Sequence, residues 1–254
     1  MTELEQIVPA ADPALHLAGP TACLLLHGFT SQPQEMSFLA DDLFQRGYTV
    51  LNLRLAGHGT QPADLARVHW QDWLLSVEEG LDLLHGCSEH AFLIGQSMGA
   101  MTALAAAARM QTAGVVALST PFYGFPFYSI ILSHLAGLLG WTARKSADED
   151  PVLGARREAG YPAYARYPAG IIAELAGLNR AMRLSLPQVR VPVLLIQSRQ
   201  DLEGRDDLEK IYARLGSVTK ERIWLEGFDH SVVRDDKRAA VFNAIDRFIQ
   251  TTGS

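Results

Sequence analysis

Residues 92–100 read Phe92-Leu93-Ile94-Gly95-Gln96-Ser97-Met98-Gly99-Ala100. The apolar residues at the start predict a buried strand, and the alanine-rich residues after Gly99 predict a helix. Between them stands Gly-x-Ser-x-Gly, the pattern of a tight strand-to-helix turn that lifts a serine hydroxyl above the edge of a sheet. Side chains at Gly95 and Gly99 would collide across so sharp a turn. The stretch therefore predicts a nucleophilic Ser97 on an α/β sheet.

The composition limits the class of protein. The 254 residues can bury one large core, and 48% of them are hydrophobic while 20% are charged. The net charge of −6 argues against nucleic acid or an anionic membrane surface as the main partner. Residues 1–5 are acidic and lack the apolar stretch of a secretory signal, and the longest apolar run, residues 130–141, is too short to span a bilayer.

The two cysteines and the histidine spacing restrict the site chemistry. Cys23 falls in an expected core strand and Cys87 follows an expected helix, so we expect buried thiols rather than a disulfide framework. There is no Cys-x-x-Cys pair and no histidine cluster at metal-ligand spacing, so no metal site is expected. These features favour a cytoplasmic protein.

Strand-like and helix-like segments alternate along most of the chain. Such alternation predicts a mainly parallel sheet with helices on both faces, joined by right-handed crossovers. We expect strands at residues 22–26, 48–53, 91–94, 115–118, 193–197 and 222–225, and helices at residues 33–46, 70–84, 97–110, 206–215 and 238–249.

One segment interrupts the alternation. Residues 121–187 contain no clear strand but many aromatic residues, namely Phe122, Tyr123, Phe125, Phe127, Tyr128, Trp141, Tyr161, Tyr164 and Tyr167. We interpret residues 121–186 as a helical cap inserted into a core of residues 1–120 and 187–254, because so long an insertion in a compact domain is usually functional. The alternative is two long surface helices of the main domain.

A serine hydroxyl needs a base within hydrogen-bond reach, and that base needs an orienting acid. On a sheet of this kind the expected chain order is serine, acid, histidine. Asp201 follows one late strand and His230 follows the next, and active sites on open α/β sheets lie outside the carboxyl ends of strands. The sequence therefore predicts that Ser97, Asp201 and His230 converge.

Other acids and histidines compete for these two positions. Glu203, Asp206 and Asp207 follow Asp201 closely, but Asp201 is nearest the strand end. Of the eight histidines only His230 lies after both the last strand and the acid, and its alternative is a solvated loop residue. Candidates for structural roles are His27 and His58, which stand beside glycines in loops, and Asp229, expected in a turn.

A tetrahedral intermediate of acyl transfer requires two backbone N–H donors. One is expected from Met98, the residue after the serine. The other is expected from Phe29, in the sequence His27-Gly28-Phe29-Thr30 after the first core strand, where Gly28 lets the chain turn.

Together these motifs resemble the α/β-hydrolase family, and within it the small microbial carboxylesterases and monoacylglycerol lipases. The likeness rests on the stretches at residues 24–30, 57–59, 95–99, 199–201 and 227–230, and extends from about residue 20 to the C-terminus outside the cap. It implies Ser97 as nucleophile, His230 as general base then acid, Asp201 as orienter, Phe29 and Met98 as oxyanion donors, and no cofactor. One departure is Arg54-Leu55-Ala56, where many relatives have an acidic residue and a second arginine.

The resemblance implies hydrolysis of short- to medium-chain acyl esters or monoacylglycerols through an acyl-enzyme intermediate. The cap aromatics and Phe29 suggest an apolar pocket, although they could equally serve only to pack the cap. A thioesterase, an amidase or a C–C bond hydrolase would carry the same triad. Epoxide hydrolases and haloalkane dehalogenases are disfavoured because they need an aspartate at position 97. The remote alternative is a non-catalytic binding protein.

Overall fold

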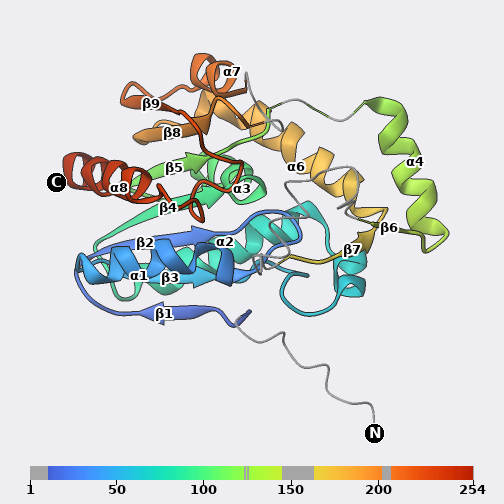
Figure 1. Ribbon diagram of the computed structural model, residues 1–254, viewed down its shortest axis with the longest axis horizontal. Helices are drawn as coiled ribbons and strands as arrows, with labels where there is room; N and C mark the ends of the chain where they lie inside the picture. Colours follow the sequence, from blue (N-terminus) through green and yellow to red (C-terminus); the bar gives the residue numbers. More distant parts are fainter. Residues whose placement is uncertain (1–10, 123, 125, 145–162, 202–206, 254) are drawn as a thin grey trace, which may run out of the picture.

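The computed structural model describes residues 11–122, 124, 126–144, 163–201 and 207–253. A seven-stranded sheet forms its centre, in the order β1-β3-β2-β4-β5-β8-β9 (Figure 1). Every neighbouring pair is parallel except β1 and β3. The mainly parallel sheet expected from the alternating pattern is therefore confirmed. The strands are β1 (Ala14–His16), β2 (Thr21–Leu26), β3 (Thr49–Leu53), β4 (His90–Gln96), β5 (Gly114–Leu118), β8 (Val193–Ser198) and β9 (Lys220–Leu225).

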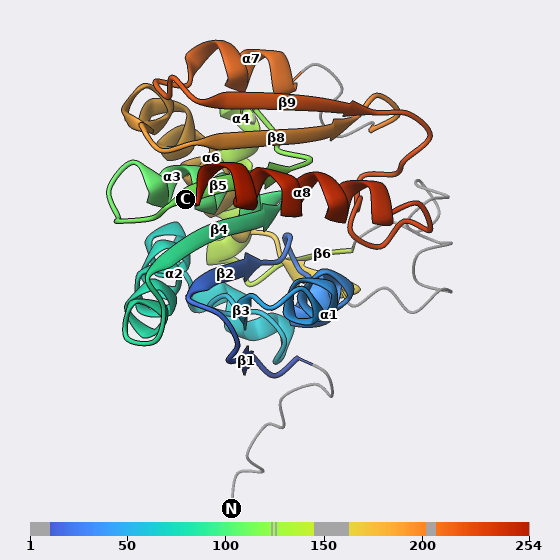
Figure 2. The ribbon, with the colours of Figure 1, turned by 90° about the vertical axis from the view of Figure 1, so that its left-hand side faces the viewer.

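Helices cover both faces of the sheet (Figure 2). On one face lie α1 (Ser37–Gln45) and α8 (Ala239–Thr252), and on the other α2 (Trp70–His85), α3 (Met98–Ala107), α6 (Ile171–Ser185) and α7 (Asp207–Arg214). Neighbouring residues of a strand point to opposite faces, so Leu24 and Leu25 of β2 belong to the two different apolar clusters. The unbroken apolar strands of the sequence are buried on both sides for this reason.

Some local details differ from the expected elements. The helix expected at residues 33–46 begins as the 3₁₀ helix η1 (Pro33–Met36), and Gly47 follows α1 with a φ of 91°. The edge strand β1 and the 3₁₀ helix η2 (Pro62–Arg67) were not predicted, because both are too short to show a period. Both cysteines are free thiols, but only Cys23 is buried, so the expectation of burial is wrong for Cys87.

Between β5 and β8 the chain forms α4 (Phe127–Leu138), β6 (Thr142–Arg144), β7 (Arg166–Pro168), α6 and the 3₁₀ helix η3 (Leu186–Gln188). The paired β6 and β7 are three residues each, which explains why no strand was evident in the sequence. Here α6 packs on α3 and α2 and so covers the core, whereas α4 packs on α6 at the edge of the molecule (Figure 1). Tyr123, Phe125, Tyr161 and residues 145–160 lie outside the described residues.

Candidate active site

The serine turn has the geometry that the sequence predicts. Ser97 stands between the end of β4 and the start of α3, with φ 55° and ψ −112°, a conformation that is unusual for a residue with a side chain. Its N–H donates a 2.8 Å hydrogen bond to the backbone oxygen of Leu118 in β5. A Cβ on Gly95 would collide with the backbone of Gly99, and one on Gly99 with the backbone of Leu26. Both glycines are therefore required for this turn.

The predicted acid and histidine are brought together by the loops after β8 and β9. The Nδ1 atom of His230 lies 2.8 Å from Oδ2 of Asp201, and both side chains are buried. The same carboxylate oxygen accepts a 2.6 Å hydrogen bond from Nε2 of Gln197. A carboxylate accepts hydrogen bonds and does not donate them. In the neutral imidazole the proton therefore sits on Nδ1, and Nε2 is the basic atom. This pair can therefore orient a general base.

Three residues that the sequence did not single out hold the His230 loop or Asp201. Gln96 Nε2 donates to the backbone oxygen of His230 at 2.8 Å, and Ser198 Oγ donates to that of Phe228 at 2.6 Å. The third is Gln197, described above. Polar residues at the carboxyl ends of two apolar strands are the sequence feature that would have indicated them, and all three are buried.

The competing acids lie elsewhere or outside the description. Asp207 is buried at the start of α7, where its carboxylate accepts the Phe122 N–H at 2.8 Å. Asp229 lies in the loop after β9 but not in the turn expected of it, and its Oδ1 accepts the N–H of His230 at 2.6 Å. Glu203 and Asp206 fall outside the described residues.

The loop after β2 is fixed by buried polar contacts. His27 is fully buried, with Nδ1 3.0 Å from the oxygen of Gly28 and Nε2 accepting the Leu55 N–H at 3.2 Å. Burial lowers the pKa of His27, which keeps the ring neutral with its proton on Nδ1. Gly28 N–H donates to Oε2 of Glu35 at 2.6 Å. The structural role expected of His27 is therefore confirmed.

The two expected oxyanion donors come from two segments of the core. Phe29 follows Gly28 in this loop, and Met98 is the first residue of α3. The first N–H groups of a helix are not used inside it, and the helix dipole favours negative charge there. A backbone amide at this position is therefore suited to a developing oxyanion.

Aromatic side chains of the inserted segment pack against this loop. The rings of Phe29 and Tyr167 meet edge to face with centroids 5.3 Å apart, and Tyr164 stacks on His58 at 6.4 Å. The Tyr164 hydroxyl accepts the Thr60 N–H at 2.9 Å, and the Tyr164 N–H donates to the oxygen of Thr30 at 2.9 Å. The segment before α6 is thus attached to the loop that carries Phe29.

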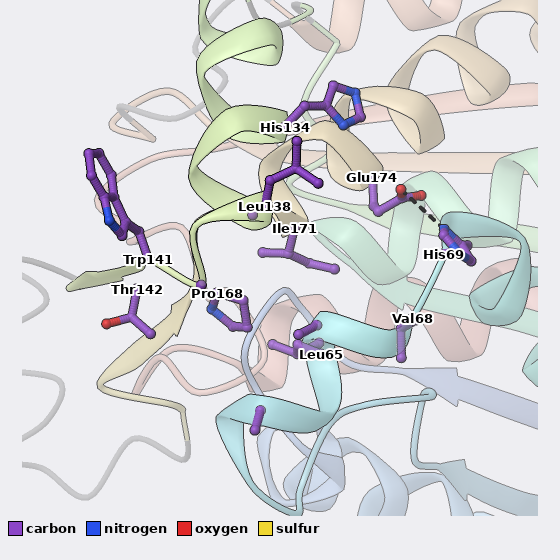
Figure 3. Close-up of a pocket in the computed structure, with 15 residues that line it drawn as sticks. Leu65, Val68, His69, His134, Leu138, Trp141, Thr142, Pro168, Ile171 and Glu174 are labelled. Carbon is purple, nitrogen blue, oxygen red and sulfur yellow. Dashed lines mark hydrogen bonds and ion pairs between the residues drawn. The ribbon is translucent and has the colours of Figure 1, made fainter.

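A cavity of about 560 Å³ lies between η2 and the inserted segment (Figure 3). Leu65, Leu138 and Ile171 come together within it, and Nδ1 of His69 lies 3.3 Å from Oε1 of Glu174 at one side (Figure 3). None of the five predicted site residues lines it. It is nevertheless close to the Phe29 loop, because Pro168 lines it and the preceding Tyr167 contacts Phe29.

No group of three or more His, Cys, Asp or Glu side chains within the described ranges is arranged to hold a metal ion. Among the helices that the structure describes, none is long and apolar enough to cross a membrane.

The chain is similar in sequence to proteins that are named as a lipase and an esterase. The chain is 28% identical over the full length of both proteins to a thermostable monoacylglycerol lipase of Bacillus sp. (strain H-257). It is 24% identical to a carboxylesterase of Bacillus subtilis, over 91% of this chain and 93% of that protein. A structure from work on the metagenome-derived lipolytic enzymes LipS and LipT superposes with a TM-score of 0.85 at 28% identity, covering 97% of this chain and 100% of the other.

The structure of a Paleococcus ferrophilus monoacylglycerol lipase, 17% identical, superposes with a TM-score of 0.80 over 94% of this chain and 98% of the other, and supports the same fold. The family model described as "Serine aminopeptidase, S33" matches residues 20–237. The α/β-hydrolase fold expected from the motifs is confirmed, and the chain belongs to this family of α/β hydrolases.

Proposed function

We propose that this serine hydrolase cleaves carboxylic esters with short- to medium-chain acyl groups, or monoacylglycerols, with Ser97 as its nucleophile. The observation that carries the proposal is the Asp201–His230 hydrogen bond of 2.8 Å beside the strained serine turn. Ser97 follows directly on Gln96, whose side chain contacts the backbone of His230.

In the proposed reaction Ser97 Oγ attacks the ester carbonyl carbon while Nε2 of His230 takes the hydroxyl proton. The N–H groups of Phe29 and Met98 bind the resulting oxyanion. When the intermediate collapses, the C–O bond to the alcohol breaks and the imidazolium gives the alcohol its proton. Water then attacks the acyl-enzyme with the same imidazole as base, which frees the acid and restores Ser97. Asp201 holds the ring and stabilises the imidazolium.

The apolar part of the substrate is proposed to lie against the inserted segment. The cavity of about 560 Å³ is within the range of small-molecule sites, about 300–1,000 Å³, and its lining is mainly apolar. Tyr167 and Pro168 connect it to the Phe29 loop. The curated relatives are named for lipase and esterase activity, which agrees with an apolar acyl group.

Two further proposals concern the inserted segment and the location of the protein in the cell. Residues 121–186 act as a cap, supported by the way α4 projects beyond α6 and the way Tyr164 and Tyr167 pack on the core loops. The cytoplasm is the proposed location, supported by the free, exposed thiol of Cys87. Cell fractionation would test the second.

Hydrolysis of p-nitrophenyl esters from acetate to palmitate, with Ser97→Ala measured in parallel, tests the proposal. We expect a maximum at one chain length, complete loss in Ser97→Ala, and a falling rate below about pH 6–7, where an unperturbed histidine becomes protonated. A pH profile that is flat through this range would contradict the role of His230.

The family description names an aminopeptidase, and a thioesterase or C–C hydrolase would use the same residues. Acyl-CoA thioesters and amino-acid p-nitroanilides therefore belong in the same assay. A wild-type protein that is inactive on every ester but cleaves one of these would replace the ester proposal. Failure of a serine-directed phosphonate to label Ser97 would favour a binding protein.

A further inference from the structure

A buried carboxylate lies between the two loops of the proposed site. Glu35 belongs to η1, is 1% exposed, and was not singled out in the sequence. Its Oε2 accepts the Gly28 N–H at 2.6 Å, and its Oε1 accepts the Ser231 hydroxyl at 3.2 Å. Gly28 precedes the expected oxyanion donor Phe29, and Ser231 follows His230. One side chain therefore connects two loops that are far apart in the sequence.

Contacts to both polar groups of Gly28 restrict the direction of the next peptide group. The Gly28 N–H is held by Glu35, and the Gly28 oxygen by Nδ1 of His27 at 3.0 Å. The oxygen of Gly28 and the N–H of Phe29 lie in one peptide plane and point in opposite directions. With both polar groups of Gly28 fixed, the direction of the Phe29 N–H is fixed as well.

The fit around Gly28 is tight. A Cβ on this residue would lie 3.2 Å from Oε2 of Glu35 and 3.6 Å from the backbone oxygen of Gln96. The loop therefore packs closely against both the carboxylate and the last residue of β4 at this point. A shift of Glu35 would move the Gly28 backbone relative to the serine turn.

The second contact of Glu35, with Ser231, holds the loop that carries His230. Ser231 is itself buried, so its hydrogen bond to Glu35 lies inside the protein. A parallel connection runs from Nη1 of Arg234 to the oxygen of Gln34 at 3.0 Å. The residues after His230 are thus attached to η1 at two adjacent positions.

We propose that Glu35 is a positioning residue for the reaction, which sets the oxyanion loop and the His230 loop at a fixed separation through Gly28 and Ser231. The inference rests on the proposed ester hydrolysis at Ser97. Burying a carboxylate is unfavourable unless hydrogen bonds compensate it, and here the hydrogen bonds go to two segments that must stay aligned during acyl transfer.

The test compares Glu35→Ala with Glu35→Gln. Alanine removes both hydrogen bonds, whereas a glutamine amide can still accept from Gly28 and can donate to Ser231 Oγ. We expect Glu35→Ala to lower kcat about 10- to 100-fold with KM changed less than about threefold, because misplaced catalytic groups slow chemistry more than binding. Glu35→Gln should keep kcat within about threefold of the wild type. Ser231→Ala, which breaks one contact, should lower kcat about three- to tenfold.

Thr112→Val is the control for simple loss of stability. Its buried hydroxyl donates to the Ala91 oxygen at the amino end of β4, far from the serine turn, and its loss should leave kcat unchanged. Wild type and Ser97→Ala are assayed alongside. An inactive wild type would refute the ester function itself, while an active wild type with one of the following results would refute only the role of Glu35.

The proposal is overturned if Glu35→Ala retains kcat within about twofold, if its loss lies entirely in KM, or if Glu35→Gln loses as much as alanine. If Glu35→Ala fails to fold, the kcat values of Glu35→Gln and Ser231→Ala test the proposal in its place. A Ser231→Ala variant with unchanged kcat would then overturn the proposal, and a fall of about threefold or more with retained kcat in Glu35→Gln would support it.

Discussion

The side-chain amide of Gln96 donates a 2.8 Å hydrogen bond to the backbone oxygen of His230. Gln96 is the last residue of β4, so its backbone leads into the Ser97 turn while its side chain holds the loop of the proposed base. The two positions are 134 residues apart in the sequence. This single contact therefore sets the serine turn and the histidine loop relative to each other without involving the reacting atoms.

Gln96→Leu should test this coupling. The substitution leaves the buried oxygen of His230 without this donor, so we expect the free energy of unfolding to fall by about 1–3 kcal/mol. We expect kcat on the best p-nitrophenyl ester to fall about tenfold because the base is less well held. Urea unfolding and steady-state kinetics measure the two effects. A variant that loses stability but keeps its kcat would show that the contact is structural only.

Asp201→Asn should affect catalysis far more than stability. The amide can donate to Nδ1 and so favour the tautomer in which Nε2 carries the proton and cannot act as a base. A Ser-His-Asp triad loses about 10⁴-fold in kcat on this change. Glu226→Gln removes an exposed carboxylate from the loop after β9 and is the matched control, with kcat expected to change less than about twofold. Comparable activity in the two variants would exclude Asp201 as the orienting acid.

The buried ring of His27 predicts how stability depends on pH. Burial lowers its pKa below the unfolded value of about 6.5, while Glu35 and the Gly28 oxygen raise it and Arg54 lowers it. Below about pH 6.5 the unfolded chain therefore binds a proton here that the folded chain does not. The stabilisation is fully present above that pH and is lost as the pH falls.

His27→Asn removes this titration. Its amide can still donate to the Gly28 oxygen, so the fold should be retained. Between about pH 7.5 and 5.5 the free energy of unfolding of the wild type should fall more steeply than that of the variant, by up to about 1.4 kcal/mol per pH unit. Parallel slopes in urea unfolding would mean that His27 has the same pKa in both states.

The sequence predicted most of the sheet and the Asp201–His230 pair, because buried parallel strands are continuous apolar runs and because the residues after their carboxyl ends meet at one edge. The sequence also predicted the role of Gly95 and Gly99, because a sharp turn excludes side chains at these two positions. Short elements were not predictable: β1, η2, β6 and β7 contain too few residues to show a period.

The residues that align the site were missed for a different reason. Gln96 and Glu35 act through hydrogen bonds to a segment distant in the sequence, and Gln197 acts on Asp201, four residues away. The identity of these residues alone does not say which partner they meet. A polar residue at the end of an apolar strand indicates a buried hydrogen bond, but only the fold shows to which loop it goes.

The contact between α4 and α6 offers a test of the proposed cap. A Cβ on Gly137 would lie 3.1 Å from the Cα of Gly170, and Ser133 Oγ donates to the oxygen of Ala169 at 2.8 Å, so small residues let the two helices meet closely. Gly137 also lines the cavity of Figure 3.

Gly137→Leu should therefore push α4 away from α6 and alter the apolar cavity, while the central sheet is unaffected. We expect the preferred p-nitrophenyl ester chain length to change, with kcat/KM on acetate altered less than about threefold because the reacting groups lie on the core. Leu139→Ala, at an exposed position next to the end of α4, is the control and should keep the wild-type profile. If Gly137→Leu folds and its chain-length profile equals that of the wild type, then neither α4 nor this cavity contacts the acyl chain, and the substrate must be bound by the core alone.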